Sequence, residues 1–593
     1  MIAPMTKYSF ILLKGDQEGL LEKLQEIGLV DITRSVKPID DKSAAILADA
    51  ERKHALLQSL DKVEIPEGLA HSAVSGDPEE VAKAALDHLA ELEEALQTAE
   101  KEAAASEPWG EYDRDKLRAV EDAGIPVHFH ITPAKAFKAE WADQYALTVV
   151  NELDGKVYYV VAGEDPLPDA LKRGPKTSVT DIQTRIATLQ ANIDQEKAVL
   201  AGVKDVRGKI ENAARRNLSD LDLYLASQAA VPAAENTLVT LVGYAPAEDE
   251  EAVTKALDAT GEYYFKDAAA VEDNPPISFR NNKFVKMFEV LTDMYGRPAY
   301  NGFDPTPFIA VFFLLFFAFC MGDAGYGLIL IVIGLLLKKV DSFKSFFPLV
   351  VTLGAATTVI GFLFHTFFSV DISQWSIFQG FPFLPSKIAG YDGTMVLALV
   401  VGVLHISLAM IVKTIEETKT KGFKESLGTW GWTLLIVGGV AVAAFALTGV
   451  LDKAATKWVI IVLGVLSCLG IFVLNNIHRN PLINIGSGLW DTYNMASGLL
   501  GDVLSYLRLY ALGLAGSMLG MAFNSIGAMI LGDGSNWAMW IPFLLIVIVG
   551  HTLNIAMCVL GAFVHPLRLN FLEFFKNSGY EAAGRNYNPL KKQ

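Results

Sequence analysis

Hydrophobic and polar positions divide the chain into two halves with different patterns. Up to about residue 306, charged residues are dense and no long apolar run occurs, whereas apolar runs of 17 or more residues recur from Pro307 onward. Because a helix needs about 20 mostly apolar residues to cross a bilayer, the second half predicts a membrane domain. We expect a cytosolic region at 1–306, a membrane domain at 307–575 and a cytosolic tail at 576–593.

The first half combines apolar, strand-like stretches with amphipathic ones. Residues 8–13, 17–27 and 29–32 predict a strand, a helix and a second strand. Similar strand or helix patterns occur at 127–131, 145–150, 157–161, 237–242, 249–257 and 263–265. These units predict small α/β lobes, which we interpret as structural domains without a site of their own.

Two further stretches have the periodicity of long helices. In the later one, apolar residues are spaced alternately by three and four positions, at Val179, Ile182, Ile186, Leu189 and Ile193. This spacing is typical of a heptad seam. The earlier one, at 78–105, is rich in Ala, Glu, Leu and Lys, and Leu89, Leu92 and Leu96 lie on one side of it. We expect the two stretches to pair as an antiparallel coiled-coil arm that joins the α/β lobes.

The second half contains eight candidate membrane spans, at 307–321, 323–338, 346–369, 393–413, 428–450, 457–475, 489–531 and 537–566. At about 1.5 Å per residue the seventh is too long for a perpendicular crossing, so it must be strongly tilted, broken or partly outside the bilayer. With a cytosolic N-terminus, the inner loops would hold eight Lys and Arg residues and the outer loops three. This asymmetry follows the positive-inside rule and places the C-terminus in the cytosol.

Composition excludes several classes of protein. The net charge of −17, concentrated in the first half, argues against a nucleic-acid partner. The three cysteines, Cys320, Cys468 and Cys558, lie in apolar segments, so neither a disulfide framework nor a metal cluster is indicated. No cleaved signal is expected at the N-terminus. The chain has no G-x-x-x-x-G-K-[ST] motif, and we predict no nucleotide site, cofactor or catalytic activity.

Ionisable residues gather in the last two apolar segments. Arg508 lies within GDVLSYLRLYALGLA, and its guanidinium stays charged in a protein. At bilayer depth it costs about 2.5–3.5 kcal/mol on insertion scales, so it needs a function or a fixed partner. The alternative is a membrane-end arginine that snorkels to the headgroups. The other ionisable groups here are Asp491, Asp502, His551, His565 and Arg568. Together they predict the lining of a water-filled cavity.

Several motifs resemble the membrane stator subunit of V-type and A-type rotary ATPases, called subunit a, or subunit I in archaea and bacteria. The two most diagnostic motifs are SYLRLYALGLAG and GAFVHPLRLNFLEFF in the last two segments. The resemblance extends to NNKFVKMFEVLTDMYGRPAYNGFDPTPF at the junction of the halves, to FFLLFFAFCMGDAGYG and to TLVTLVGYAPAE. The chain thus resembles this family along most of its length.

This resemblance implies a non-catalytic, ion-translocating subunit in a prokaryotic plasma membrane. In the family, two half-channels face a rotating ring of proteolipid subunits, and the soluble half grips peripheral stalk subunits. The arginine matching Arg508 keeps the ring carboxylate ionised, and the one matching Arg568 assists. Asp502, His551 and His565 would be half-channel linings. Where some members carry a glutamate, this chain has Cys558, so Asp491 or Glu573 could supply a channel carboxylate instead.

Two other functions were weighed against this one. A stand-alone secondary transporter should show internal repeats and paired broken helices, and the sequence has no convincing repeat. A purely structural anchor would leave the two arginines and the histidines of the last spans without a role. We interpret the earlier membrane histidines, His365 and His405, as hydrogen-bonded structural residues. The choice between protons and sodium ions, and between synthesis and hydrolysis, stays open at this point.

Overall fold

The structure is a computed structural model. It describes residues 1–592 apart from 36, 67, 112, 165–178, 234, 236, 341–342, 344–345, 374–384, 386, 389, 448, 450–451, 475–480 and 533–535. The chain forms two compact units, which are described separately below. Unit 1 comprises Met1–Ser9, Gly243–Lys255 and Tyr264–Asn588, and unit 2 comprises Phe10–Val242, Ala256–Tyr263 and Pro589–Gln593. Two cations of the predicted inner loops, Lys344 and Arg479, lie outside the described residues.

A five-stranded sheet has the strand order β2-β7-β1-β8, with β6 paired to β7. Its strands are β1 (Met5–Leu13), β2 (Asp31–Ile32), β6 (Val231–Ala233), β7 (Leu238–Pro246) and β8 (Tyr264–Ala268). The accompanying helices are α1 (Gln17–Ile27) and α8 (Glu250–Asp258). Alternate residues of β1 are buried, as the two-residue repeat of a strand requires. The predicted strands and helices in this part of the chain are confirmed, although β2 is shorter than expected.

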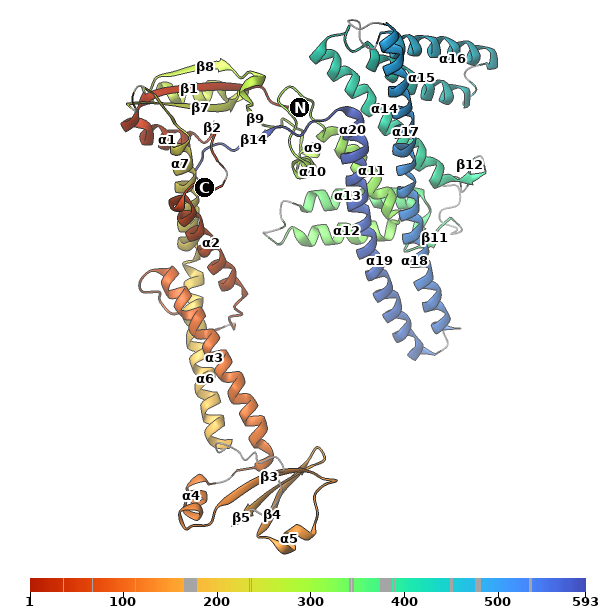
Figure 1. The fold of residues 1–593 in the computed structure, drawn as a ribbon. Helices are drawn as coiled ribbons and strands as arrows, with labels where there is room; N and C mark the ends of the chain where they lie inside the picture. Colours follow the sequence, from red (N-terminus) through yellow and green to blue (C-terminus); the bar gives the residue numbers. More distant parts are fainter. Residues whose placement is uncertain are drawn as a thin grey trace. The chain divides into compact units, whose positions relative to one another are not determined.

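In unit 2, long helices pack in pairs (Figure 1). The pairs are α2 (Asp41–Lys62) with α7 (Arg207–Gln228), and α3 (Pro78–Ser106) with α6 (Val179–Asp205). Helices α3 and α6 are antiparallel, because His88 Nδ1 lies 2.8 Å from Glu196 while Arg185 lies 2.5 Å from Glu102. Leu89, Leu92 and Ile193 belong to their shared hydrophobic core. The two stretches that were expected to pair therefore do so.

A second, three-stranded sheet in unit 2 has the antiparallel order β3-β5-β4. Its elements are β3 (Val127–Pro133), β4 (Leu147–Leu153) and β5 (Lys156–Ala162), with the short helices α4 (Arg114–Asp122) and α5 (Glu140–Gln144). Val157, Tyr159 and Val161 alternate along β5 and form the small core. The structure thus contains the predicted mixture of α/β lobes and long helices in the first half of the chain.

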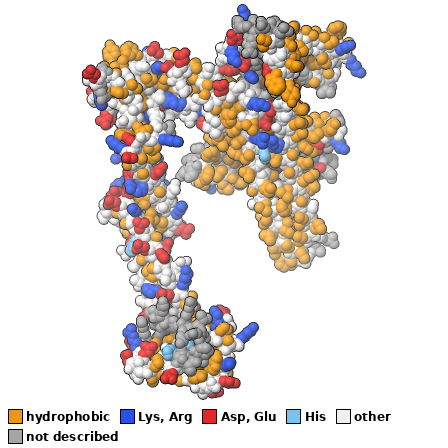
Figure 2. Space-filling model, in the orientation of Figure 1, with side chains coloured by type: hydrophobic (Ala, Val, Ile, Leu, Met, Phe, Trp, Pro, Cys, Tyr) orange, Lys and Arg blue, Asp and Glu red, His pale blue; other side chains and the backbone are white. Residues whose placement is uncertain are grey.

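Apolar helices dominate unit 1 from Thr306 onward. They are α11 (Thr306–Met321), α12 (Ala324–Leu337), α13 (Phe347–Leu363), α14 (Gly393–Lys421), α15 (Leu427–Leu447), α16 (Lys453–Cys468), α17 (Pro481–Ser505), α18 (Leu507–Leu531) and α19 (Trp540–Arg568). On the face drawn in Figure 2, hydrophobic side chains cover α18 and α19. Within the described residues, five helical segments are long and apolar enough to cross a membrane, and α11, α12 and α13 are shorter apolar helices.

Three predicted spans differ from the helices. The third was expected over 346–369, but α13 ends at Leu363 and a hairpin of β10 (Thr366–Phe367) and β11 (Val370–Asp371) follows. The seventh is interrupted at Tyr506, between α17 and α18. The eighth continues past Arg568 through a π-helix at Leu569–Phe574 into α20 (Phe575–Ser578). The hydrophobic runs therefore predicted the apolar helices here but did not predict where the helices end.

Short elements complete unit 1. They are β9 (Pro276–Ile277), β12 (Lys387–Ile388), β13 (Tyr391–Asp392), β14 (Arg585–Asn586), α9 (Lys283–Lys286) and α10 (Glu289–Tyr295). The C-terminal β14 pairs in parallel with β9, just before the junction that leads through α9 and α10 into α11. This pairing ties the end of the chain to the start of the membrane half.

Candidate functional site

The interruption at Tyr506 places Arg508 in the first turn of α18. Around this point the backbone makes shorter-range hydrogen bonds, from Tyr506 N–H to Val503 O at 3.1 Å and from Leu509 N–H to Tyr506 O at 3.0 Å. Such i→i+3 bonds tighten a helix locally. The Tyr506 side chain is fully buried, and its hydroxyl lies 2.8 Å from Nδ1 of His405 on α14. The break is therefore anchored to a neighbouring helix.

Arg508 itself is half-buried and incompletely hydrogen-bonded. Its Nη1 is buried and has no hydrogen-bond partner among the described residues. A guanidinium carries five N–H donors in a fixed plane and keeps its charge. Leaving such a donor buried and unsatisfied costs free energy, so its presence here requires an explanation. A partner outside this chain would provide one.

The π-helix that follows α19 brings a carboxylate close to Arg508. Glu573 lies in this segment, is 4 % exposed, and its Oε2 has no hydrogen-bond partner among the described residues. Arg508 is close enough to Glu573, and also to His565, to interact with both electrostatically. Pro566 lies inside α19 and cannot donate a backbone hydrogen bond, three residues before the π-helix begins. Short π-helical segments frequently occur at functional sites.

The remaining predicted site residues are placed differently. Asp502 accepts hydrogen bonds from Lys576 Nζ at 3.2 Å and from Asn577 Nδ2 at 2.8 Å, which joins α17 to α20. Arg568 is exposed, and it interacts electrostatically with His565 one helical turn earlier. Asp491 is exposed on α17. Arg508 is within electrostatic range of both Glu573 and His565, and we call these three residues the arginine cluster. Arg568 and Asp491 lie on exposed surfaces of the chain.

His551 lies in a second group of polar side chains. Its Nδ1 is 2.7 Å from Tyr326 Oη, and its Nε2 is 2.9 Å from Asn524 Oδ1. Asn554 donates to Tyr326 Oη at 2.8 Å. We call these four residues, together with Asp323, the aspartate cluster. Sequence reasoning found His551 but missed Tyr326, Asn524 and Asn554. Two asparagines inside otherwise apolar helices were the signal that could have pointed to them.

The position at which a channel glutamate was considered also belongs to this second group. Cys558 donates to Asn554 Oδ1 at a sulfur–oxygen distance of 3.4 Å. All three cysteines are free thiols. Over the part of the chain that is described, no group of three or more His, Cys, Asp or Glu side chains could hold a metal ion.

Comparison with known proteins shows which family the chain resembles. The sequence profile of the V-type ATPase 116kDa subunit family matches residues 169–377. Along its whole length the chain is 25% identical to the V-type ATP synthase subunit I 1 of Treponema pallidum, over 657 aligned positions that cover 100% of both chains. These matches support the resemblance of the chain to a rotary ATPase subunit a or subunit I.

Archaeal members of the family are more similar over a shorter stretch. The A-type ATP synthase subunit I of Methanocaldococcus jannaschii is 30% identical over 385 residues, which cover 59% of this chain and 54% of that one. The subunit I of Pyrococcus abyssi is 32% identical over 367 residues, with 59% and 53% covered. In these alignments the chain spans about half the length of its relatives.

One solved structure has a partial likeness to the chain. It is the cytoplasmic N-terminal domain of subunit I, homolog of subunit a, of V-ATPase, with 15% identity over 45% of this chain and 100% of that one. The TM-score is 0.20, which does not establish a shared fold. Within the described residues, five apolar helical segments are long enough to cross a membrane, which is typical of a multi-pass membrane protein.

Proposed function

We propose that this chain is the ion-translocating stator of a rotary V- or A-type ATPase. It would form two half-channels against a proteolipid ring and couple ion movement to ATP hydrolysis or synthesis in partner subunits. The chain itself would hold no nucleotide and no cofactor. The observation that carries this proposal is the half-buried Arg508, whose Nη1 is buried without a hydrogen-bond partner among the described residues. A ring carboxylate moving past this point would supply the missing acceptor.

Physical chemistry explains why an arginine suits this position. A fixed positive charge nearby lowers the pKa of a carboxylate, so an arriving ring site must release its ion. The guanidinium cannot give up its own proton, so it would also block a direct proton leak between the half-channels. A lysine could lose its charge when desolvated and would be a weaker barrier. Arg568, exposed one turn beyond His565, would assist from the neighbouring helix.

The arginine cluster supplies the groups that could carry ions to and from this point. Glu573 has a buried, unpartnered carboxylate oxygen close to Arg508, and His565 interacts with both arginines. Asp502 is 15% exposed at its side chain and paired with Lys576, so it would form the edge of the same path. Asp491 on the exposed side of α17 and His551 in the aspartate cluster complete the proposed lining.

The topology is part of the proposal. Eight crossings would follow if α11, α12 and α13 cross together with the five longer segments. At about 1.5 Å per residue, the 16 residues of α11 extend roughly 24 Å, less than a bilayer core of about 30 Å. These helices would therefore need a locally thinned bilayer or irregular backbone at their ends. Both the N-terminal half and the C-terminus would be cytosolic, in a prokaryotic plasma membrane.

The soluble half would act as the arm that resists torque. The antiparallel pair of α3 and α6 would form a coiled coil, and the α/β lobes would bind peripheral stalk subunits. In this division residues 1–306 are the cytosolic arm, 307–575 the membrane domain and 576–593 the cytosolic tail. Helices of this length suit a strut because their backbone hydrogen bonds resist bending along the axis.

Reconstitution tests the proposal against a stand-alone transporter. Vesicles containing the chain alone are compared with vesicles containing the complete complex, and ATP-driven ion uptake is measured in both. The stator assignment predicts uptake only by the complex, with the chain co-purifying with a proteolipid ring. Ion uptake by the isolated chain in response to an imposed ion gradient would contradict it and favour a secondary transporter.

A further inference from the structure

The hairpin after α13 contains an unusual turn. Thr366 pairs with Asp371 and Phe367 with Val370, so Phe368 and Ser369 form a two-residue turn between β10 and β11. Both turn residues have positive φ, 48° for Phe368 and 58° for Ser369. A two-residue turn with positive φ at both positions normally contains Asn and Gly, because other side chains are strained in this conformation. Something must therefore hold this turn in place.

The carboxylate of Asp323 does so. Its Oδ1 accepts a hydrogen bond from Phe368 N–H at 2.9 Å, and its Oδ2 accepts one from Ser369 N–H at 2.6 Å. At the same time Oδ1 caps α12 by accepting from Gly325 N–H at 2.8 Å and from Tyr326 N–H at 3.2 Å. Asp323 is 1% exposed. Four backbone donors thus satisfy a buried carboxylate and attach the strained turn to the start of α12.

The clamped turn continues into the side-chain network around His551. The carbonyl oxygen of Phe368 accepts from Asn524 Nδ2 at 2.8 Å, and Asn524 Oδ1 faces His551 Nε2. The Phe368 ring packs edge-on against His551 and Tyr326, with centroids 5.7 and 5.9 Å apart. Ser369 fits tightly against α18, because a Cβ on Gly520 would lie only 2.0 Å from its Oγ. Only glycine at position 520 leaves room for the turn.

The directions of these hydrogen bonds define one form of His551. Asn554 Nδ2 can only donate, so Tyr326 Oη accepts from it and turns its own proton toward His551 Nδ1. Nδ1 must then be the acceptor, and Nε2 carries the proton that is donated to Asn524 Oδ1. The network therefore holds one neutral tautomer of the imidazole, and the orientation of Asn524 depends on the carbonyl of the clamped turn.

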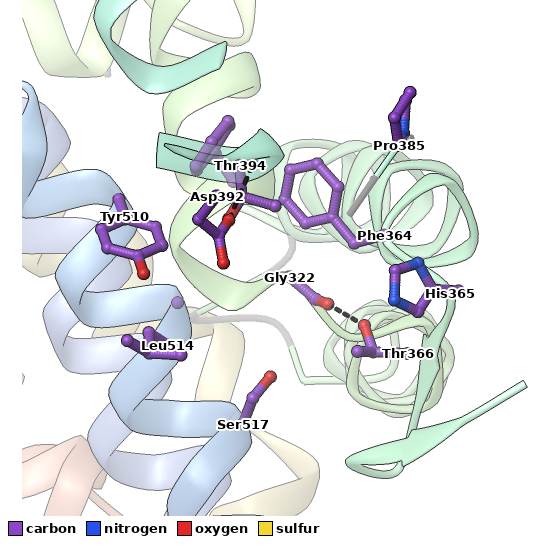
Figure 3. A pocket seen from close by; sticks show the side chains of 12 residues that line it. Gly322, Phe364, His365, Thr366, Pro385, Asp392, Thr394, Tyr510, Leu514 and Ser517 are labelled. Atoms are coloured by element: carbon purple, nitrogen blue, oxygen red, sulfur yellow. Dashed lines mark hydrogen bonds between the residues drawn. The ribbon is translucent and has the colours of Figure 1, made fainter. Parts of the chain in front are cut away.

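The same hairpin forms one wall of a cavity beside α18 (Figure 3). The cavity has a volume of about 200 Å³. His365 and Thr366 line one side of it, and Tyr510, Leu514 and Ser517 of α18 line the other. Thr366 Oγ1 donates to the carbonyl of Gly322, next to Asp323. Tyr510 belongs to α18, so the hairpin borders a cavity along the helix that carries Arg508.

We propose that Asp323 is a positioning residue for ion translocation. Its carboxylate clamps the Phe368–Ser369 turn, and this turn fixes both the hydrogen bonds of His551 and the cavity wall beside the helix of Arg508. The inference rests on the proposed function and adds a role for a carboxylate that carries no ion. The four hydrogen bonds that it accepts all come from backbone N–H groups, which fits a clamp.

Second-site rescue tests the clamp. In Asp323→Asn one carboxylate oxygen becomes an NH₂ group that faces the Ser369 N–H, and ATP-driven ion uptake by the complete complex should fall about tenfold, as expected for loss of a charge-assisted hydrogen bond. Ser369→Gly removes the strain of the positive φ, so Asp323→Asn/Ser369→Gly should recover at least about half of the uptake. The matched control is Asp323→Asn/Val370→Gly, because Val370 lies in β11 outside the turn, and it should show no recovery.

Hydrogen exchange of the hairpin amides separates a clamp from an ion carrier. In the assembled complex, amides of residues 364–372 should exchange faster in Asp323→Asn and return toward wild-type rates in the double variant. Loss of uptake with unchanged exchange, or with no rescue by Ser369→Gly, would overturn the proposal. If Asp323→Asn does not assemble, Ser369→Gly alone decides: it should slow exchange in the hairpin and preserve uptake, and faster exchange would contradict the clamp.

Arg508→Ala is measured in parallel, so that failure of the clamp can be told from failure of the proposed function. If Arg508→Ala retains uptake, the proposed function is wrong, while the exchange rates still report on the clamp. If Arg508→Ala abolishes uptake and the hairpin amides of Asp323→Asn exchange at the wild-type rate, the clamp alone is wrong.

Discussion

The arginine cluster and the aspartate cluster lie in the same apolar half of the chain. They differ in how completely their charged groups are hydrogen-bonded. Asp323 receives hydrogen bonds from backbone groups at both carboxylate oxygens. Arg508 has a buried Nη1 without a partner among the described residues, and Glu573 nearby has an unpartnered Oε2. The Asp323 carboxylate is satisfied by backbone donors, whereas the Arg508 guanidinium keeps a buried donor without an acceptor among the described residues.

This difference separates a charged group that stabilises the fold from one that we propose takes part in transport. Burying a charge is tolerable when hydrogen bonds compensate for lost water, and such a group then holds the fold in one arrangement. A buried polar group without a partner costs free energy, so each one needs an explanation such as a water, an ion or a functional partner. Substitutions in the aspartate cluster should therefore lower stability and affect transport only through the geometry that is lost, whereas substitutions in the arginine cluster should act on transport directly.

The largest effect is expected for Arg508→Ala. ATP-driven ion uptake by the reconstituted complex should be abolished, while the complex still assembles and hydrolyses ATP, because no hydrogen bond of Nη1 within the described chain is lost. The matched control is Arg280→Ala, an arginine with a 70% exposed side chain outside the apolar helices. Uptake near the wild-type rate in Arg508→Ala would remove the distinction between the two clusters.

Replacing His551 should produce a large loss of stability. His551→Leu leaves Tyr326 Oη and Asn524 Oδ1 without their partner, and each buried polar group left unsatisfied costs about 1–3 kcal/mol. The melting temperature of the detergent-solubilised complex should fall by several degrees. His565→Leu is the matched comparison, because His565 makes no such pair of side-chain hydrogen bonds among the described residues, and it should lower uptake more than stability. The reverse ranking would contradict the assignment of the two histidines.

A smaller effect is expected where the two helices of the seventh span meet. Tyr506→Phe removes the hydrogen bond to His405 Nδ1 while it keeps the ring, so the free energy of unfolding should fall by about 1 kcal/mol. The control is Tyr493→Phe, whose ring is 67% exposed on α17. Thermal denaturation of the two variants side by side measures the difference. Equal stability of both would mean that the contact with α14 does not anchor the break.

The smallest effect concerns a satisfied carboxylate outside the membrane half. Hydrogen bonds from the Ser43 side chain, the Tyr224 hydroxyl and the Ser43 backbone lower the pKa of Asp40 from 3.8 to about 2. Because the folded pKa lies below the unfolded one, the stabilisation is present above pH 4 and is lost as the pH falls toward 2. Amide hydrogen exchange at the start of α2, corrected for intrinsic rates, should show that protection decreases as the pH falls from 4 toward 2. In Asp40→Asn the protection should be lower at neutral pH and no longer change over this range.

Elements with a clear hydrophobic period could be predicted from sequence. The helix at 17–27 matches α1, and the strand at 8–13 lies within β1, because an amphipathic repeat specifies both the type of element and its buried face. The antiparallel pairing of α3 and α6 followed from apolar spacing in the same way. The hairpin after Leu363 could not be predicted, because Phe368 and Ser369 lack the Asn-Gly signal of such a turn and extend an apolar run.

The members of the candidate site could be predicted better than their arrangement. Charged residues in apolar segments pointed to Arg508 and to His551, but spacing along the chain could not show that they belong to different clusters. The break at Tyr506 has no proline or glycine to mark it, and the π-helix that carries Glu573 depends on packing. Asn524 and Asn554 gain their role only from contacts with Tyr326 and His551, which are distant in sequence.

Disulfide cross-linking tests most directly whether Arg508 faces a partner outside this chain. With Cys320, Cys468 and Cys558 replaced, Leu504→Cys is placed one turn before Arg508, at a side chain that is 52% exposed, and is paired with a cysteine beside the ring carboxylate. Trp458→Cys on α16, 68% exposed, is the control. If Arg508 faces the ring, we expect a cross-link from position 504 that stops ATP hydrolysis until it is reduced, and none from position 458. Equal cross-linking from both positions, or from 458 alone, would contradict it.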